Sequence, residues 1–182
     1  MEYLYSRVVI NCAGFYSDRV AEMAGIDIDE AGYRLFLTRG EYYSVGNGRN
    51  RMLNGLVYPV PQPLGPGVHV CLDVERRLRL GPLFHRADEV NYRMDDSRRS
   101  EFEESSIMKI LPFILPEDLE PESSGIMCNL YPRGKPPDYI IRHEADRGLP
   151  GLINLVGIDS PGITASPAIA RYVAGMVDEM LG

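Results

Sequence analysis

Residues 151–164 are Gly151-Leu152-Ile153-Asn154-Leu155-Val156-Gly157-Ile158-Asp159-Ser160-Pro161-Gly162-Ile163-Thr164. The apolar run at its start is typical of a buried strand, and the glycines and proline that follow predict a tight turn. A strand, a tight turn and a helix N-terminus in this order leave backbone N–H groups free to meet a ligand oxygen. The long C-terminal helix is predicted by apolar residues at helical spacing, namely Ile169, Tyr172, Val173, Met176, Val177 and Met180.

A second strand-and-turn element lies near the start of the chain. Residues 7–14 are Arg7-Val8-Val9-Ile10-Asn11-Cys12-Ala13-Gly14, a β-branched run that ends in small residues. This pattern predicts a buried strand of a parallel or mixed sheet. Ser17 or Asp18 is placed to cap the helix that follows, and Gly25 is placed to end it.

The middle of the chain has strand patterns. Residues 33–38 and 41–45 predict two strands that flank Arg39-Gly40, and residues 56–60 predict a third. In residues 68–74 apolar side chains alternate with other residues, His69 among them, which predicts a half-buried strand. Apolar residues resume at Leu78 after a charged turn, so we expect a hairpin there.

The remaining elements complete an α+β fold. We expect a helix from Asp95 or Asp96 to about Ile110, a loop over residues 116–124, and strands over residues 125–131 and 138–142. The order α/β, then β-rich, then α/β indicates an antiparallel or mixed sheet inserted between two pieces of a nucleotide-binding layer. We place the division at residues 1–32 and 144–182 for that layer, and at residues 33–143 for a β-sheet domain with one helix.

Composition narrows the classes of function. The chain has 182 residues and a net charge of −7, which argues against a nucleic-acid partner. Its three cysteines form no CxxC motif, so we expect neither a zinc site nor a disulfide framework, and a reducing cytoplasmic location fits best. No secretory signal is visible, and the longest apolar runs are too short to predict a transmembrane segment.

Four blocks of sequence resemble one known family. Residues 8–18, Leu56-Val57-Tyr58-Pro59-Val60-Pro61 with Gly67-Val68-His69-Val70, Leu80-Gly81-Pro82, and residues 157–166 occur in the order typical of FAD-dependent oxidoreductases of the D-amino-acid-oxidase superfamily. Among its subgroups the chain is most similar to the L-2-hydroxyglutarate dehydrogenase or oxidase branch. The resemblance covers nearly the whole chain, and it implies a substrate-domain sheet flanked by the C-terminal portions of an FAD-binding layer.

Two departures from this family matter for function. Family members begin with a strand, a GxGxxG turn and a helix that bind the dinucleotide, and this sequence contains no such element. We therefore expect an incomplete, truncated flavoprotein that binds FAD weakly or not at all by itself. The family also usually has an arginine after the Gly125-Ile126 pair, where this chain has Met127. A bidentate partner for a substrate carboxylate is thus missing at that position.

The resemblance implies two cofactor-binding turns. Amides at the start of the final helix would lie near the pyrimidine edge of the flavin, which becomes negatively charged on reduction. The alternative is that both segments are ordinary strand-to-helix turns, and that Cys12 is a small buried apolar residue. The cofactor-binding candidates are Cys12, Ala13, Gly14, Gly157, Ile158, Asp159, Gly162, Ile163 and Thr164.

The substrate-site candidates are His69, Tyr58 and Arg39. The family implies that His69 is the catalytic base or hydrogen-bond donor toward a substrate hydroxyl, although a lone strand histidine is often structural. Tyr58 would orient the substrate, or it simply packs. Arg39 would hold an anionic group, or it is a solvated turn residue. Arg76, Arg77 and Arg79 alternate with other residues and predict a solvated strand face, and no histidines have metal-ligand spacing.

These observations support two hypotheses from different classes. In the first, the chain belongs to an FAD-dependent oxidoreductase that oxidises a 2-hydroxy acid such as L-2-hydroxyglutarate, or an amino acid or amine, by hydride transfer to flavin. Within this class an amine such as sarcosine or glycine, or glycerol 3-phosphate, is an alternative substrate. A complementing subunit or an upstream region would then supply the dinucleotide fold. In the second, the chain is a non-catalytic interaction module derived from this fold, and its exposed apolar surface forms a homo-oligomer or pairs with another subunit.

Overall fold

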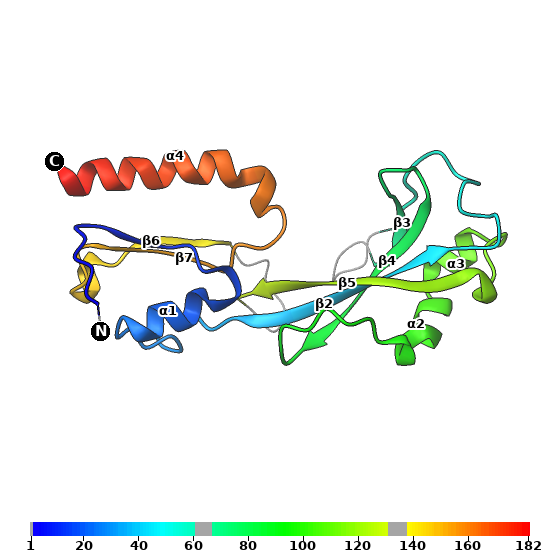
Figure 1. Cartoon of the computed structure of the whole chain (residues 1–182), viewed down its shortest axis with the longest axis horizontal. Coiled ribbons are helices and arrows are strands. Elements are labelled where there is room, and N and C mark those ends of the chain that lie inside the picture. The colour runs from blue at the N-terminus through cyan, green and yellow to red at the C-terminus, as the bar shows by residue number, and fades with distance from the viewer. Residues whose placement is uncertain (1, 61–66, 131–137) are drawn as a thin grey trace. The chain divides into compact units, whose positions relative to one another are not determined.

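The computed structural model describes residues 2–60, 67–130 and 138–182, and it divides the chain into two compact units. The first unit contains Met1–Leu37 and Met127–Gly182, and the second contains Thr38–Ile126. The chain passes from one unit to the other within strands β2 (Phe36–Val45) and β5 (Leu119–Asn129) (Figure 1). The expected α+β class is confirmed. These bounds differ from the expected ones, since Tyr33 packs in the core of the first unit and β6 (Ile140–His143) belongs to its sheet.

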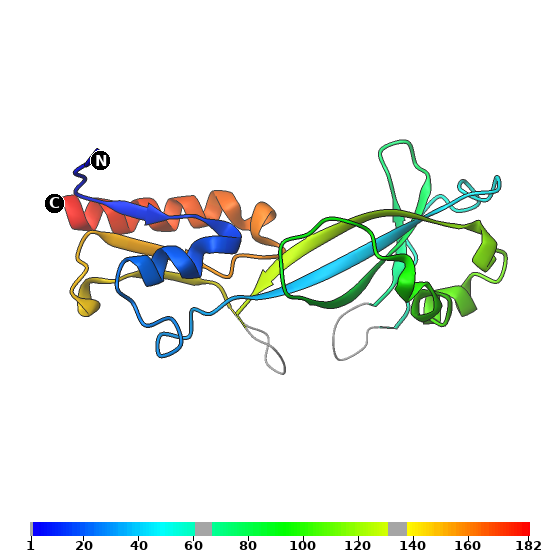
Figure 2. The ribbon, with the colours of Figure 1, turned by 60° about the horizontal axis from the view of Figure 1, so that its bottom comes forward.

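The first unit is built on a mixed sheet. In the described part of the chain its strand order is β1–β7–β6, where β1 is Val9–Asn11, β7 is Leu152–Val156 and β6 is Ile140–His143. Strands β1 and β7 are parallel, and β6 is antiparallel to β7. Helix α4 (Gly162–Leu181) runs along this sheet in both views, and α1 (Ser17–Met23) lies on the opposite side (Figures 1 and 2).

Strand β7 is buried on both faces, as its continuous apolar run predicts. Ile153 and Leu155 pack against α4 through Val173 and its neighbours. Leu152 and Val156 point to the other side and join a cluster with Ala21, Tyr33 and Leu130. The expected apolar stripe of α4 is correct except at Tyr172, which is 58% exposed. Short 3-10 turns, Gly14–Tyr16 and Ala145–Arg147, complete this unit.

The second unit is built on a sheet of strand order β3–β4–β2–β5 within its described residues, where β3 is His69–Leu72 and β4 is Leu78–Ala87. The predicted hairpin is confirmed, since β3 and β4 are antiparallel with Val70 opposite Leu80. Helices α2 (Arg99–Glu103) and α3 (Ser106–Ile110) cover one face of the sheet, and Phe102 and Ile107 are fully buried there. Two further 3-10 turns are Asp96–Arg98 and Pro116–Asp118.

Several predicted elements of the second unit were wrong in detail. Residues 36–45 form one continuous strand, because Gly40 gives room to the side chains of Pro82 and Phe84 on β4. Residues 56–60 form no strand, and they are held beside β3 by a hydrogen bond from the Val70 amide to the Val57 carbonyl (2.8 Å). The helix expected over residues 95–110 is divided, because Ser105 has an extended backbone.

Strand β5 begins at Leu119, inside the segment expected to be a loop. Leu119 is buried in the core of the unit. The polar residues after it lie in an edge strand, one face of which is exposed to solvent. Residues 61–66 and 131–137 lie outside the described residues. They include Pro61, at the end of a family-like block, and Tyr131, the last residue of an expected strand.

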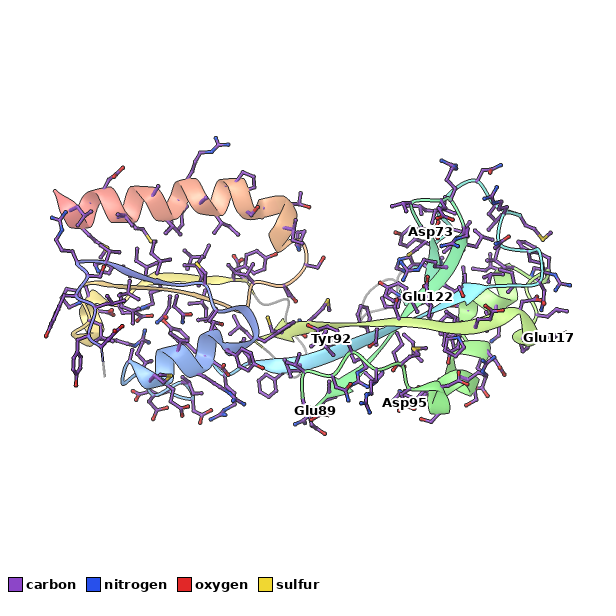
Figure 3. The ribbon with its side chains drawn as sticks, viewed as in Figure 1. Asp73, Glu89, Tyr92, Asp95, Glu117 and Glu122 are labelled. Atoms are coloured by element: carbon purple, nitrogen blue, oxygen red, sulfur yellow. The ribbon has the colours of Figure 1, made fainter. Side chains whose placement is uncertain are left out.

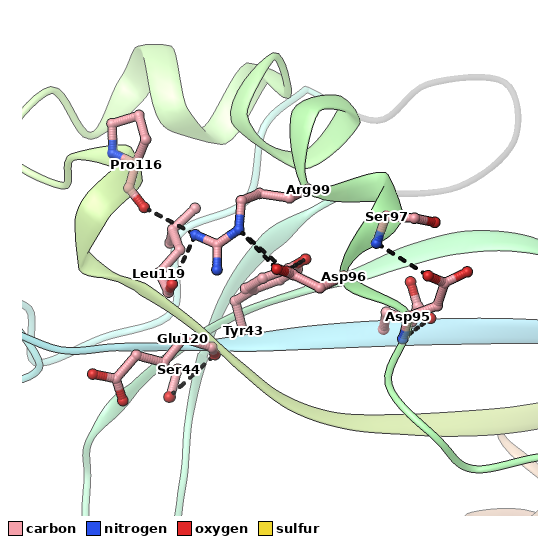
Figure 4. A network of polar contacts seen from close by, with 10 residues as sticks. Tyr43, Ser44, Asp95, Asp96, Ser97, Arg99, Pro116, Leu119 and Glu120 are labelled. Carbon is pink, nitrogen blue, oxygen red and sulfur yellow. Dashed lines mark hydrogen bonds and ion pairs between the residues drawn. The ribbon is translucent and has the colours of Figure 1, made fainter.

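Arg99 joins the start of α2 to the start of β5 (Figure 4). Its Nη1 donates to the carbonyls of Leu119 (3.0 Å) and Pro116 (3.3 Å), and its Nε donates to Asp96 (3.1 Å). The guanidinium also lies over the ring of Tyr43, whose hydroxyl donates to Asp96 (2.7 Å). These contacts fix the helical layer against the sheet from one end.

Candidate functional site

The predicted site residues lie in two groups, one in each unit. We call the residues after β1 and β7 the turn site, and the residues around His69 the sheet site. The turn site contains all of the predicted cofactor-binding residues, Cys12 to Gly14 and Gly157 to Thr164. The sheet site contains His69 and Tyr58.

The first turn is organised by the buried side chain of Asn11. Its Nδ2 donates to the Ser17 carbonyl (2.7 Å) and to Oδ1 of Asn154 (2.8 Å), while its Oδ1 accepts from the amide of Ala13 (3.2 Å). Gly14 follows with φ +57°, and the space beside its Cα is open. A left-handed glycine facing open space lets another molecule approach the backbone closely.

The second turn is shaped by two glycines. Gly157 has φ +72°, and a Cβ there would lie 2.4 Å from Cγ of Leu130. A Cβ on Gly162 would lie 2.5 Å from Cγ2 of Ile158. Both glycines are therefore required by packing inside the protein, which supports the ordinary-turn interpretation for their side-chain positions. This interpretation concerns only their side-chain positions and not the backbone N–H donors of the turn.

Asp159 is held inside this turn. Asn129 donates from Nδ2 to Oδ2 of Asp159 (2.5 Å), and the Gly162 amide donates to its carbonyl (2.5 Å). Burial raises the pKa of the Asp159 carboxyl, and hydrogen bonds from its own backbone and from Asn129 only partly oppose that shift. Asp159 therefore orders the turn from inside.

The N-terminus of α4 has unused donors. Pro161 is the N-cap residue, and no side chain caps the helix. The amides of Ile163 and Thr164 have no hydrogen-bond partner in the part of the chain that the structure describes, and both residues are exposed. A 20-residue helix adds its dipole to these N–H groups, so the position favours a partial negative charge.

The two turns are brought together by parallel pairing of their strands. Asn11 lies opposite Asn154, so both chains leave the sheet at the same edge. Cys12, Ile158 and Gly162 line one open apolar groove of about 600 Å³ between the sheet and α4. The structure therefore unites predicted residues from both ends of the chain.

The sheet site is centred on His69, which is 8% exposed. Its Nδ1 lies 2.9 Å from the carbonyl oxygen of Gly67. Because a carbonyl only accepts hydrogen bonds, Nδ1 carries a hydrogen in this contact, so the lone pair of the uncharged form of the ring lies at Nε2. The ring of Tyr58 stacks on the imidazole, with centroids 4.2 Å apart and an interplanar angle of 18°. The geometry thus presents a histidine oriented as a proton acceptor.

Arg39 is not grouped with His69 and Tyr58. The Cβ direction of its neighbour Gly40 points to Pro82 and Phe84, and side chains alternate along a strand, so Arg39 lies on the opposite face of β2. There it faces His85, whose Nδ1 lies 3.9 Å from Oε2 of the buried Glu41. Burial lowers the pKa of His85, Glu41 opposes that shift, and Arg98 and Arg39 add to it. An anion-binding role for Arg39 stays a prediction.

Sequence reasoning missed Tyr42 as a member of the sheet site. Gly81 lies opposite His69, and a Cβ on Gly81 would lie 2.5 Å from Cδ1 of Tyr42. The Tyr42 ring therefore covers the same face of the sheet as His69. Burial raises the pKa of its hydroxyl, followed by the charge of Cys71, and Arg79 opposes the shift. Only the pairing of distant strands shows that Tyr42 shares a face with His69. The sequence alone shows that Tyr42 lies two positions after Gly40, so these two residues project to the same side of their strand.

Among residues 2–60, 67–130 and 138–182, no cluster of three or more His, Cys, Asp or Glu side chains is arranged to hold a metal ion. Over the same ranges, no helix combines the length and hydropathy that crossing a bilayer requires.

Comparison with known proteins gives the family. Residues 2–176 match the family described as DAO, FAD dependent oxidoreductase. The chain belongs to this family. The resemblance inferred from the four sequence blocks is therefore confirmed, and the general function of the family is FAD-dependent oxidation and reduction.

Several individual relatives are named as L-2-hydroxyglutarate dehydrogenases or as enzymes of glycerol 3-phosphate oxidation. The chain is 33% identical to the mitochondrial L-2-hydroxyglutarate dehydrogenase of Arabidopsis thaliana over 186 residues, which cover 94% of this chain and 38% of that protein. It is 28% identical to a glycerol 3-phosphate dehydrogenase of Caloramator mitchellensis, with 92% of this chain and 33% of that protein covered. The chain thus spans about a third of the length of these relatives.

The turn site fits part of a flavin. The free amides of Ile163 and Thr164 at a helix N-terminus match a ring edge that gains negative charge on reduction. The open backbone at Gly14 leaves room for close approach of a planar ring. Nothing in residues 2–60, 67–130 and 138–182 supplies a glycine-rich phosphate-binding turn, so the donors present match only the ring end of FAD.

Proposed function

We propose that the chain forms the substrate-binding sheet and one wall of the flavin site of an FAD-dependent dehydrogenase for a 2-hydroxy acid such as L-2-hydroxyglutarate. Residues outside this sequence, in the same or a second polypeptide, supply the dinucleotide-binding fold. The observation that carries the proposal is His69, whose Nδ1 donates to the Gly67 carbonyl and leaves Nε2 free as a base.

In this function each group has a defined task. A bound FAD would supply the acceptor for the hydride that leaves the carbinol carbon of the substrate. Nε2 of His69 accepts the hydroxyl proton, so that loss of a hydride and a proton converts the alcohol to a ketone. Tyr58 holds the imidazole plane by stacking and closes one side of the base to water. The amides of Ile163 and Thr164 are the groups that would hold the flavin edge through hydrogen bonds.

The decisive experiment measures dye-linked oxidation of L-2-hydroxyglutarate by the chain mixed with a polypeptide from the same genome that carries the GxGxxG segment. We expect activity only in the mixture, and we expect His69→Gln to reduce kcat about 100-fold or more. The matched control is His143→Gln, since His143 also contacts a carbonyl, that of Pro150 (2.7 Å), but lies in the first unit.

Flavin binding gives a second test of the same proposal. The chain alone should quench the fluorescence of added FAD weakly or not at all, because it holds donors for the ring end only. A yellow chain that carries tightly bound stoichiometric flavin without any partner would contradict the proposed division of the site between this sequence and residues outside it.

A non-catalytic interaction module is the second candidate, and Met127 favours it, since the family's usual carboxylate-binding arginine is replaced there. Exposed apolar residues in the first unit, Val9 at 52% and Ile163 at 94%, offer surface for association. Size-exclusion chromatography separates the candidates. A stable flavin-free oligomer that gains no activity on mixing supports the module, and restored activity supports the enzyme.

A further inference from the structure

The sheet face that carries His69 continues to Arg79. In the β3–β4 hairpin His69 lies opposite Gly81, and Cys71 lies opposite Arg79. Side chains of residues that are directly paired, or two positions apart along a strand, project to the same face. Arg79 is therefore a diagonal neighbour of His69 on one surface, at a backbone spacing of roughly 7–8 Å.

The guanidinium of Arg79 is held in place by three residues of strands β2 and β5. It lies over the Tyr42 ring, 5.0 Å from the centroid. Its Nε forms an ion pair with Glu122, which Figure 3 shows on β5, and its Nη2 donates to Oγ of Ser123 (2.7 Å). Arg79 thus reaches across β2 and is fixed at both sides, which sequence analysis did not predict when it placed Arg79 on a solvated face.

Two polar groups at this position remain unused. Nη1 of Arg79 and the hydroxyl of Tyr42 have no hydrogen-bond partner among the described residues. The Arg79 side chain is 27% exposed, so a ligand can reach it. Glu122 neutralises the charge of Arg79 in the ligand-free protein. The guanidinium can therefore stay in a fixed, half-buried position when no ligand is bound.

Arg77, two residues earlier, shows the difference. Its side chain is 48% exposed and it pairs with Asp73 and Glu75 within its own turn. It packs on no aromatic ring among the described residues. A strand arginine that is only solvated would resemble Arg77, whereas the Arg79 guanidinium packs on Tyr42, on the sheet face that also carries His69.

We propose that Arg79 and Tyr42 bind a second anionic group of the substrate, at the end of the molecule away from the carbon that is oxidised. The inference rests on the proposed function of His69. The shared ligand chemistry is a short alcohol with a carboxylate or phosphate at its far end, bound by Nη1 of Arg79 and the Tyr42 hydroxyl. Charge-assisted hydrogen bonds of this kind are among the strongest available to a binding site.

The test is an NMR titration of the full chain with three ligands. L-2-hydroxyglutarate carries a distal carboxylate, L-2-hydroxyvalerate has the same carbon chain without it, and glycerol 3-phosphate carries a phosphate. We expect the first or the third to bind about 10-fold or more tightly than hydroxyvalerate. The response of the His69 ring signals to each ligand reports occupation of the sheet site.

The variants separate recognition from folding. Arg79→Gln should abolish the advantage of the anionic ligand and leave hydroxyvalerate binding unchanged, and Arg79→Lys should restore part of it. Tyr42→Phe keeps the ring under the guanidinium, so the fold is preserved, and should weaken only the anionic ligand about threefold or more. Arg77→Gln is the matched control and should change neither.

The outcomes distinguish this inference from the function on which it rests. Equal affinities for all three ligands, or an Arg79→Gln effect that is equal on all three, would overturn the role of Arg79 while leaving His69 in place. Absence of any response at His69 to every ligand would overturn both proposals.

Discussion

Asn11 in β1 donates a hydrogen bond from Nδ2 to Oδ1 of Asn154 in β7, at 2.8 Å, across the pair in which the two residues lie opposite one another. Asn154 in turn donates to Oε1 of the buried Glu144 (2.9 Å), and Asn11 accepts from the Ala13 amide. A continuous set of buried hydrogen bonds therefore connects the core of the first unit to the first turn of the candidate flavin site.

Replacing Asn154 with alanine should lower the free energy of unfolding by about 2 kcal/mol, because Asn11 and Glu144 each lose a buried partner. The chain has no tryptophan, so urea unfolding is best followed by far-UV circular dichroism. Asn91→Ala is the control, since Asn91 makes only exposed local hydrogen bonds, to Glu89 and from the Arg93 amide. Equal losses of unfolding free energy in the two variants would show that the buried hydrogen bonds of Asn154 contribute no more stability than the exposed ones of Asn91.

The buried Glu144 should make the stability of the folded protein sensitive to acid. Burial opposes its ionisation, but hydrogen bonds from Tyr33, Asn154 and Arg147 outweigh burial and hold its pKa below the ordinary value of 4.5. A carboxyl with a lowered folded-state pKa contributes stability above the unfolded pKa, and that stability is lost as the pH falls through the folded value. We therefore expect the native protein to lose stability steeply below about pH 4.5.

Glu144→Gln should remove much of this dependence. At neutral pH the variant should be less stable by about 2 kcal/mol, because Arg147 loses its buried partner but is itself partly exposed. Below pH 4.5 its curve should approach that of the native protein. Urea midpoints measured across the acid range provide the comparison, with Glu101→Gln on the surface as control. Parallel curves for native and variant protein would contradict the assignment.

The two terminal strand-to-turn elements were predictable because their signals are local. β-branched runs followed by glycine identify β1 and β7 without knowledge of distant contacts. The predicted burial holds for β7 but is wrong for β1, where Val9 and Ile10 are exposed. Strand β2 was predicted in two pieces because Gly40 usually interrupts a strand, and only the side chains of Pro82 and Phe84 on β4 show why it does not.

The sheet site was predictable only in part. His69 and Tyr58 were found through family-like blocks, and the structure stacks them. Arg79 and Tyr42 could not be found in this way, because their relation to His69 depends on which strands pair and in which register. Local alternation predicts that a residue faces one side of a sheet, but it does not reveal which distant residues share that side.

Gly157 should tolerate no side chain. Its φ of +72° disfavours alanine, and a Cβ would lie 2.4 Å from Leu130. Gly157→Ala should therefore lower the free energy of unfolding by about 3 kcal/mol. Gly175→Ala is the matched control with the opposite sign, since this helical glycine has open space beside it and should gain about 0.5–1 kcal/mol. Thermal melts of both variants test this difference in sign. A loss of stability in both variants would contradict it.

The three cysteines should react at different rates, and the fast one reports on the turn site. Cys12 is exposed and lines the groove, whereas Cys71 is partly buried and Cys128 is buried. Burial raises the pKa of both Cys71 and Cys128, against an opposing charge from Arg79 at Cys71 and with added repulsion from Asp159 at Cys128. Because the thiolate is the reactive form, these two should react slowly at mildly alkaline pH and accelerate as the pH rises.

A thiol reagent such as DTNB should therefore show one fast phase and two slow ones. Cys12→Ser should remove the fast phase, and Cys71→Ser, the control, should leave it. If the turn site holds a flavin in the completed enzyme, FAD added with the complementing polypeptide should slow the Cys12 phase and leave the phase of Cys128 unchanged. A fast phase that persists in Cys12→Ser would show that another cysteine is the accessible thiol. The fast phase would then not report on the turn site.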